Sequence, residues 1–334
     1  MASLAPLVET TRGDARENLH FGAIAVADTH GRLLARAGDP HWLTFTRSTL
    51  KPLQALPFMQ GGGPQHFGLD AKHLALLCAS HNGETMHVDQ VEGILEKAGV
   101  GYQRLRCGCH MPMYVELGVG PAPGTYDERQ HNCSGKHAGF LAWCVQHGQP
   151  LDTYTDPAHP LQQAIRTAVA EAVGLREEEM PMGIDGCSAP NYAMPLAHLA
   201  RGFARLAAAS EDTPFARSFA QLADAMTAHP ELVSGTARND AAFMRAGGGD
   251  WVTKVGADGV QVVASRSRGQ ALALKISDGS KPALYAATVE ALEQLGWLDD
   301  AQRQALQPWR QATISSVKGA PVGERRAVFE LSRG

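Results

Sequence analysis

The sequence contains few lysines and no long hydrophobic run. Only 8 of its 30 basic residues are lysines, so each lysine inside a motif is more informative than usual. Its apolar stretches, such as residues 23–27, are far shorter than the roughly 20 residues needed to cross a bilayer. The first residues lack the basic segment and apolar run of a signal peptide. We therefore expect a cytoplasmic protein that does not bind membranes.

Several familiar signatures are also missing. The 334 residues contain no Walker loop, no G-x-G-x-x-G fingerprint, no H-E-x-x-H and no G-x-S-x-G, so none of these motifs suggests a function. The six cysteines form no C-x-x-C pair, and a chain of this length does not need a disulfide framework. Without an export signal, we expect these cysteines to be reduced and therefore buried, metal-ligating or reactive.

The charge balance does not favour nucleic acid as a partner. Lys and Arg together number 30 and Asp and Glu number 34, which gives a formal net charge of −4 and no chain-wide positive field. Hydrophobic residues make up 44% and charged residues 19%. These are the proportions of an ordinary globular protein, and they exclude a disordered chain.

Strand-like patterns lie at both ends of the chain, and helical patterns fill most of the middle. Alternating or β-branched segments predict strands at residues 20–28, 32–38, 42–46, 251–256, 260–267, 269–279 and 323–331. Apolar residues at helical spacing predict helices at residues 73–80, 87–99, 136–148, 161–174, 193–207, 214–226 and 283–296. We predict a single α+β domain, residues 1–334. Its antiparallel sheet is built from both chain ends (about 1–50 and 245–334), and residues 51–244 form a helical part. A ligand is expected in the cleft where the two parts meet.

The first candidate site is the segment RSTLKPLQALPF, residues 47–58. Ser48 and Lys51 are three residues apart at the start of a helical pattern, so both would lie on one face near a helix N-terminus. A neutral lysine can accept the serine proton, which makes the pair a candidate nucleophile and base. With 15 serines and 8 lysines, about 0.4 such spacings arise by chance, and the alternative is an N-cap serine with a solvated lysine. Ser315 and Lys318 have the same spacing but lie in a strand-like context, where they would point to opposite faces.

Two further segments carry polar residues at the ends of apolar patterns. Lys254 lies in WVTKVG, whose K-V-G is similar to the K-T-G strand that accompanies S-x-x-K in penicillin-recognising serine enzymes. Taken alone, this tripeptide is weak, and an exposed strand lysine before a turn is the better interpretation. Ser80 lies in LLCASHNGE, where an apolar helix ends in Ser-His-Asn-Gly. The alternative for this motif is a polar helix C-cap with Gly83 in the left-handed conformation.

Cysteines in two small, polar turns suggest a metal site. Cys133 and His137 are four residues apart on one helix face, a spacing that suits zinc, and Cys187 lies in a similar turn. Together they would form a thiolate-rich site. The alternative is two small buried cysteines, which are common. The segment CGCH, residues 107–110, is a weaker metal candidate.

Five strings, in this order, resemble the asparaginase II family, the Rhizobium etli-type class 3 L-asparaginases. They are RSTLKPLQALPF, CASHNGE, CGCHMP, HNCSGKHAGFLA and GIDGCSAPNYAMPLAHLARGFARLA. The resemblance extends from about Leu7 to the C-terminal strand. It implies an amidohydrolase that converts L-asparagine to L-aspartate and ammonia. It also implies a homodimer with a fold similar to that of serine β-lactamases and glutaminases.

The resemblance further implies roles for individual residues. The two serine–lysine tandems of the family fall on Ser48 with Lys51 and on Ser80 with Lys254. The family's zinc site, two cysteines and a lysine, falls on Cys133, Lys136 and Cys187. The implied substrate contacts are Arg47 and Asp185. Spacing alone instead favours His137 over Lys136 as the third zinc ligand, because imidazole is a common ligand and lysine a rare one.

Two lysines at one site have a chemical purpose. A free lysine has a pKa near 10.4, and a general base needs that value lowered by roughly three units, about 4 kcal/mol. Neighbouring lysines and a dry cleft both lower it. The alternatives are a glutaminase or a serine amidase that acts on β-lactams or peptides. A non-catalytic zinc-thiolate binding protein is a third, although such a protein would not need both serine–lysine pairs.

Overall fold

The computed structural model describes residues 3–310 and 312–334. Within them, nine strands form one sheet in the order β10–β11–β1–β2–β9–β8–β7, with β3 beside β2 and β12 beside β3. Every pair in this sheet is antiparallel. The strands are β1 (Ala5–Arg12), β2 (Ala15–Asp28), β3 (Leu33–Ala37), β7 (Trp251–Gly256), β8 (Val260–Ser265), β9 (Gln270–Ile276), β10 (Ala312–Ser315), β11 (Pro321–Ala327) and β12 (Ser332–Arg333).

The long strand β2 brings the two ends of the chain together. Its first half pairs with β1, and its second half pairs with β9 from the C-terminal part. Side chains alternate along it: Ala23, Ala25 and Ala27 join the hydrophobic cluster of the helical part, whereas Ile24 and Val26 join a second cluster on the opposite face. The sheet therefore separates two cores.

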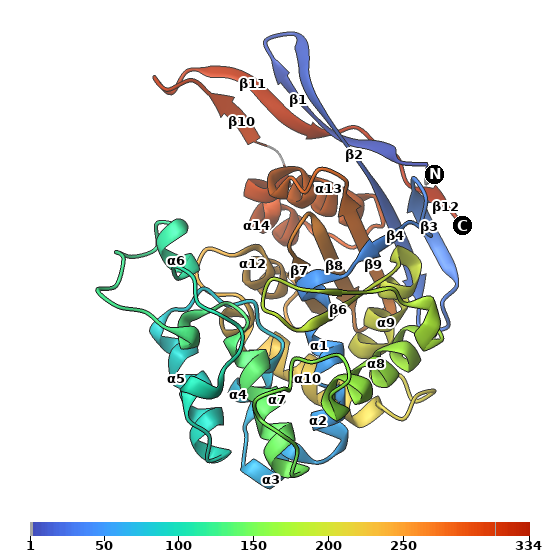
Figure 1. The fold of residues 1–334 in the computed structure, drawn as a ribbon. Coiled ribbons are helices and arrows are strands. Elements are labelled where there is room, and N and C mark those ends of the chain that lie inside the picture. The colour runs from blue at the N-terminus through green and yellow to red at the C-terminus, as the bar shows by residue number, and fades with distance from the viewer. Residues whose placement is uncertain (1–2, 311) are drawn as a thin grey trace.

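Helices cover both faces of the sheet (Figure 1). On one face α9 packs across β2, β8 and β9, and on the other α13 packs against the sheet with α14 beside it. The longer helices are α4 (Ala71–Leu77), α5 (Thr85–Lys97), α7 (Ser134–Gln146), α8 (Pro160–Val173), α9 (Leu196–Ala208), α10 (Ala216–Ala228), α12 (Asn239–Ala246), α13 (Lys281–Gln294) and α14 (Asp300–Arg310). The shorter ones are α1 (Lys51–Gln54), α2 (Leu56–Gln60), α3 (Gly63–Phe67), α6 (Met113–Glu116) and α11 (Pro230–Val233).

A small second sheet and a 3-10 turn connect the main sheet to the helical part. This sheet has the order β4–β6–β5, with bounds β4 (Leu43–Phe45), β5 (Met182–Ile184) and β6 (Pro190–Pro195). The 3-10 turn, Arg47–Leu50, follows β4 and leads into α1. It contacts β6, β7 and β8, so it lies where the two parts of the molecule meet.

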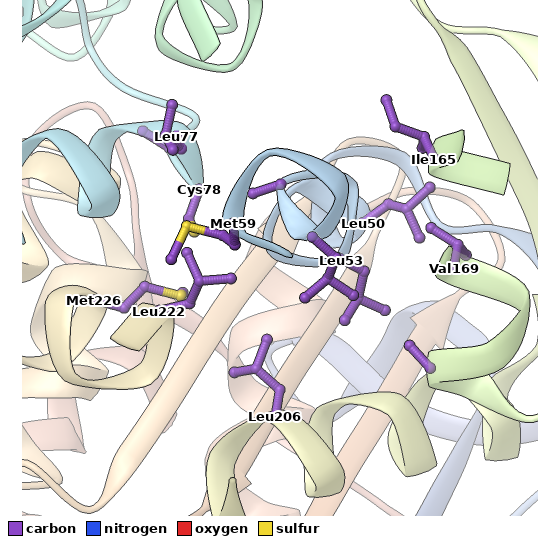
Figure 2. Close-up of a cluster of buried hydrophobic side chains, with 14 of the residues drawn as sticks. Leu50, Leu53, Met59, Leu77, Cys78, Ile165, Val169, Leu206, Leu222 and Met226 are labelled. Carbon is purple, nitrogen blue, oxygen red and sulfur yellow. The ribbon is translucent and has the colours of Figure 1, made fainter. Parts of the chain in front are cut away.

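The segment that follows the 3-10 turn runs through the middle of the helical part. Figure 2 shows Leu50 and Leu53 among buried side chains contributed by α4, α8, α9 and α10. Both leucines are fully buried, which stabilises the fold by about 1.5–3 kcal/mol for each side chain. This packing fixes the position of the short helices that carry Ser48 and Lys51.

The predicted α+β class is confirmed, with the antiparallel sheet drawn from both chain ends and the helices between them. All seven predicted helices are present with shifted bounds, and two of the shifts have a clear physical cause. Residues 193–195 belong to β6, and α9 begins only at Leu196, because Pro190–Pro195 pairs with β4 and β5. The predicted helix 73–80 is α4, which begins earlier and ends at Leu77. Its start is set by Asp70, whose carboxylate accepts hydrogen bonds from the Lys72 and His73 N–H groups.

None of the helices described here combines the length and the apolar composition that a membrane span requires.

Candidate active site

The hydroxyl of Ser80 lies between two buried lysine amines. Its Oγ is 2.9 Å from Lys51 Nζ and 3.0 Å from Lys254 Nζ. Lys51 also donates to the carbonyl oxygens of Ala79 at 2.5 Å and Asn132 at 3.2 Å, and Lys254 donates to that of Val255 at 2.9 Å. The structure thus brings both predicted lysines to one serine. No hydrogen bond joins Ser48 to Lys51 in the part of the chain that the structure describes.

The glycine of K-V-G allows the strand with Lys254 to approach the turn with Ser48. A Cβ at Gly256 would lie 2.9 Å from the Thr46 carbonyl oxygen and 3.3 Å from Arg47 Cβ. Contacts this short would force the backbones apart. Lys254 itself is in β7, the last strand in the sheet order, and every residue of this strand is buried, so it is not the exposed strand lysine of the alternative interpretation.

Burial and neighbouring charge lower the basicity of one lysine. Removal from water lowers the pKa of Lys254 to about 8, and the positive charges of Lys51 and Arg238 add to this effect. The carboxylate of Asp240, 3.5 Å from Lys254 Nζ, opposes it. A lysine of this kind is neutral in a useful fraction of molecules near neutral pH.

The motif around Ser80 is an extended segment tied to both sides. Helix α4 has already ended at Leu77, and the Ser80 and His81 N–H groups donate to the carbonyl oxygens of Val233 at 2.9 Å and Asn132 at 3.2 Å. Gly83 has a positive φ of 79°. The capping interpretation is therefore wrong for Ser80, which lies beyond the helix end.

A pocket of about 340 Å³ opens in front of the two serines. The Ser48 hydroxyl has no hydrogen-bond partner among the described residues, and it lines the pocket. It can therefore contact a bound molecule. Two cations, Arg238 and Lys281, line the pocket, and neither forms an ion pair with an acidic side chain of the described residues. The lining consists of Ser48, Ser80, Met113, Asn132, Arg238, Val255, Gly256, Ala257, Asp258, Gly279, Lys281 and Tyr285.

The residue before Ser48 has an unusual backbone that one side chain holds in place. Arg47 has a positive φ of 50°, which is rare and costly for a residue with a Cβ. The Asn191 amide oxygen accepts from the Arg47 N–H at 3.0 Å, and its NH₂ group donates to the Arg47 carbonyl oxygen at 3.0 Å. The Arg47 side chain donates to Asp185 at 2.8 Å and also pairs with Asp258. The two predicted substrate contacts, Arg47 and Asp185, therefore bind each other here.

The three residues proposed for zinc come together from two segments. Lys136 Nζ lies 3.1 Å from Cys187 Sγ, and both side chains are buried. A hydrogen bond from the Cys133 thiol and the charge of Lys136 lower the pKa of Cys187, whereas Cys187 and burial raise that of Cys133. A thiolate, a thiol and an amine in mutual contact are donors that zinc accepts after deprotonation. No cluster of three or more His, Cys, Asp or Glu suited to a metal occurs in residues 3–310 and 312–334.

His137 lies beside this cluster with one nitrogen already in use. Its Nδ1 is 2.7 Å from the Tyr154 hydroxyl, which accepts a hydrogen bond from the Arg106 N–H at 2.7 Å. Tyr154 can then give its own proton to Nδ1, which leaves the imidazole proton on Nε2. Nε2 is buried and lies against the Cys187 sulfur.

A family model described as L-asparaginase II matches residues 8–327. The chain belongs to the L-asparaginase II family. The match covers the 3-10 turn with Ser48, the segment with Ser80, both cysteine turns and Lys254, and it confirms the resemblance of the five sequence strings. Membership supports an amidohydrolase.

None of the curated proteins matches the chain. Among solved structures, the L-asparaginase II chain is similar to a β-lactamase from Mycobacterium bovis, with 17% sequence identity and a TM-score of 0.40. The alignment covers 82% of this chain and 94% of that one.

Four residues of this L-asparaginase II site have no place in the sequence predictions. Arg238 and Asn132 line the pocket, Asp240 contacts Lys254, and Asn191 holds the backbone before Ser48. Two of them belong to the polar run Arg238-Asn239-Asp240, which directly precedes the apolar residues 241–244 and is the available signal. Asn132 is next to Cys133, but nothing in its spacing indicates a role at the pocket.

Proposed function

We propose that the protein is an L-asparaginase that hydrolyses L-asparagine to L-aspartate and ammonia. The observation that supports this most strongly is the Ser80 hydroxyl between two buried lysine amines, at a pocket that also exposes Ser48. Membership of the L-asparaginase II family gives the reaction class. A nucleophile and a proton relay are thus supplied by four side chains, those of Ser48, Lys51, Ser80 and Lys254.

Ser48 is the proposed nucleophile. Its hydroxyl is unrestrained and faces the pocket, whereas Ser80 is held by both lysines. Ser48 Oγ forms a bond to the side-chain amide carbon of the substrate, and its proton enters the chain Lys51–Ser80–Lys254. Ser80 passes its own proton to the neutral amine of Lys254, the Lys51 ammonium gives a proton to Ser80, and the Lys51 amine freed in this way takes the proton of Ser48.

The same chain then delivers a proton to the leaving group. The tetrahedral intermediate collapses, the carbon–nitrogen bond breaks, and Ser80 gives a proton to the departing nitrogen, which leaves as ammonia. The protonated Lys254 restores the proton of Ser80. A water molecule then attacks the acyl-enzyme in the same way, with Lys254 again taking a proton, and releases L-aspartate and free Ser48.

A charged group of the pocket is suited to the α-carboxylate of an amino-acid substrate. Arg238 is partly buried and donates to the Asn82 side chain at 3.0 Å, but it has no acidic partner among the residues the structure describes. A partly buried, unpaired guanidinium is suited to a carboxylate. We assign Arg238 to the α-carboxylate of the substrate. Arg47 and Asp185 are joined at 2.8 Å, and the charge of Asp185 also acts on Lys136 beside Cys187.

Zinc is proposed to bind to Cys133, Lys136 and Cys187. The contact of Lys136 with Cys187 and the thiolate character of Cys187 fit a metal that accepts sulfur and nitrogen. When bound, zinc would supply a positive charge that orients the substrate. Lys136 can ligate only as a neutral amine, so metal binding has to displace its proton. We further propose a homodimer, which rests on the family resemblance alone.

Three substrates assayed together test the function. Ammonia release from L-asparagine and from L-glutamine is measured beside hydrolysis of a chromogenic β-lactam. One methylene in a pocket is worth about 1–3 kcal/mol, so we expect asparagine to exceed glutamine in kcat/KM by roughly 10- to 200-fold. Equal values for the two amides would indicate a glutaminase. Hydrolysis of only the β-lactam would indicate another serine amidase, and no turnover of any of them a binding protein.

A further inference from the structure

A buried carboxylate lies behind the lysine pair, away from the pocket. Asp240, in α12, is completely buried, as is Lys254. Its Oδ2 accepts from the Val255 N–H at 2.9 Å and lies 3.5 Å from Lys254 Nζ. Its Oδ1 accepts from the Thr253 hydroxyl at 3.1 Å and from the Gln261 amide at 3.1 Å. Asp240 does not line the pocket and cannot touch a substrate there.

The hydrogen bonds around Asp240 identify it as an anion. Val255 and Gln261 present N–H groups, which can only donate, and Thr253 gives its hydroxyl proton. Both carboxylate oxygens thus receive protons from neutral donors, which stabilises the charged form. A buried charge left without these partners would be strongly destabilising. The chain therefore maintains a negative charge at a place where no solvent reaches it.

The elements packed around Lys254 bring both positively and negatively charged side chains close to its amine. Lys51 from α1 and Arg238 from the segment before α12 are cations, and both disfavour a second ammonium group. The thiols of Cys78 and Cys133 also face the lysines, and Tyr285 from α13 faces Asp240 and Arg238. The carboxylate of Asp240 opposes these cations and raises the pKa of Lys254.

Asp240 also controls where Lys254 points. Its Oδ2 binds the Val255 N–H, and Lys254 Nζ donates to the Val255 carbonyl oxygen at 2.9 Å. The carboxylate, the backbone N–H and C=O of Val255 and the amine thus form a closed group, and the amine also contacts Ser80 Oγ at 3.0 Å. Loss of the carboxylate would free the amine to turn away from Ser80.

We propose that Asp240 is a positioning residue, which holds the Lys254 amine on Ser80 and keeps that amine basic enough to take the serine proton. This inference rests on the proposed function of the site. Burial and two cations alone would lower the pKa of Lys254 further, and Asp240 opposes them. A base whose pKa falls too far is mostly neutral but accepts a proton poorly.

The pH dependence of kcat/KM for asparagine in Asp240→Asn tests the proposal. The reactive form needs neutral Lys254, so kcat/KM rises with pH through the pKa of Lys254 and then levels off. An opposite charge nearby shifts a pKa by about one to three units. In Asp240→Asn, we therefore expect the rising limb to move to lower pH by at least about one unit, and the plateau to fall.

Asp250→Asn is the matched control. Asp250 precedes β7 at its other end, where it accepts from the Ser265 hydroxyl and the Ser267 N–H, both at 2.7 Å. Its loss removes a carboxylate at the start of β7 without touching Lys254, so the limb should stay at its wild-type position. If the rising limb of the pH profile is also unmoved in Asp240→Asn and activity falls equally at every pH, the proposal is overturned. Asp240 would then have only a structural role.

A second variant and a second readout cover the other outcomes. If Asp240→Asn does not fold, Asp240→Ser removes the charge without placing an amide NH₂ against Gln261. With only 8 lysines, ¹³C-lysine spectra can follow Lys254 directly, assigned through Lys254→Arg. We expect Lys254 to titrate at lower pH in either Asp240 variant, and an unchanged midpoint overturns the proposal. Wild-type protein that releases no ammonia from asparagine would refute the proposed function, whereas this titration would still be readable.

Discussion

Lys254 and Lys136 are both almost completely buried, and their surroundings drive their charges in opposite directions. Burial disfavours the ammonium form of both Lys254 and Lys136. At Lys254 the neighbouring Lys51 adds to this effect, and the pKa falls to about 8. At Lys136 the sulfur atoms of Cys187 and Cys133 outweigh it, and the pKa rises above its ordinary value.

The difference shows that burial does not decide what a lysine can do. A lysine beside another lysine becomes a base, because one of the two has to lose its proton. A lysine beside a thiolate stays charged, and it becomes a ligand only when a metal replaces its proton. We therefore assign proton transfer to Lys254 and metal binding to Lys136, although both belong to the same residue type in the same core.

At the site of Lys51 and Lys254, removal of the nucleophile Ser48 should lower turnover more than any other change. Ser48→Ala removes the atom that attacks the substrate, so we expect kcat for asparagine to fall by about 10³-fold or more. Ser80→Ala keeps the nucleophile but breaks the proton relay, and residual turnover should be higher than in Ser48→Ala. Ammonia release and mass-spectrometric detection of the acyl-enzyme check both variants. Wild-type turnover in Ser48→Ala would contradict the assignment.

Loss of metal should change substrate binding more than chemistry. If zinc only orients the substrate, chelated enzyme assayed at saturating asparagine should keep most of its kcat while KM rises, by about 10-fold or more if the lost contact is a charged one. Enzyme that is inactive even at saturation would show that zinc acts in the chemical step.

Lys136 and His137 are neighbours in α7 and both are candidate zinc ligands, so their alanine variants form a matched pair. Lys136→Ala should lose bound zinc, measured by metal analysis of the purified protein. His137→Ala should retain it, because the His137 Nδ1 contact with Tyr154 leaves its proton on the nitrogen that faces Cys187. Loss of metal only in His137→Ala would show that Lys136 is not the ligand.

A smaller effect is expected at the substrate carboxylate. A hydrogen bond to a charged group contributes about 1.5–3 kcal/mol, so Arg238→Ala should raise KM for asparagine roughly 10- to 150-fold. 3-Aminopropanamide is asparagine without its carboxylate, and its hydrolysis, slow in the wild type, should not weaken further in the variant. An equal loss for both amides would mean that Arg238 acts on the fold or on Lys254 instead.

The structure brings the predicted serines and lysines together, but not in the pairs that their spacing indicates. Ser48 and Lys51 were paired by their spacing of three, whereas the structure places Lys51 Nζ on Ser80, 29 positions away. Spacing describes one helix face, but a long flexible side chain reaches beyond its own helix. Only the packing of α1 against the segment after α4 determines which serine it meets.

Other parts of the site depended on backbone geometry that no pattern encodes. The positive φ at Arg47 and its support by Asn191, 144 positions away, follow from the meeting of β4 and β6. The carboxylate of Asp240 reaches Lys254 because α12 packs on β7. By contrast, the alternation of strand residues and the apolar spacing of helices are local, and they were sufficient to predict the α+β architecture.

The pH dependence of kcat/KM for asparagine in the wild-type enzyme tests most directly whether neutral Lys254 is the base. Because the pKa of Lys254 is lowered to about 8, the neutral amine predominates only above that pH. The account predicts that kcat/KM rises about tenfold per pH unit below this value, has its midpoint near pH 8, and is flat above it. A profile that is already level from pH 6 upward, or that still rises at pH 10, would contradict it.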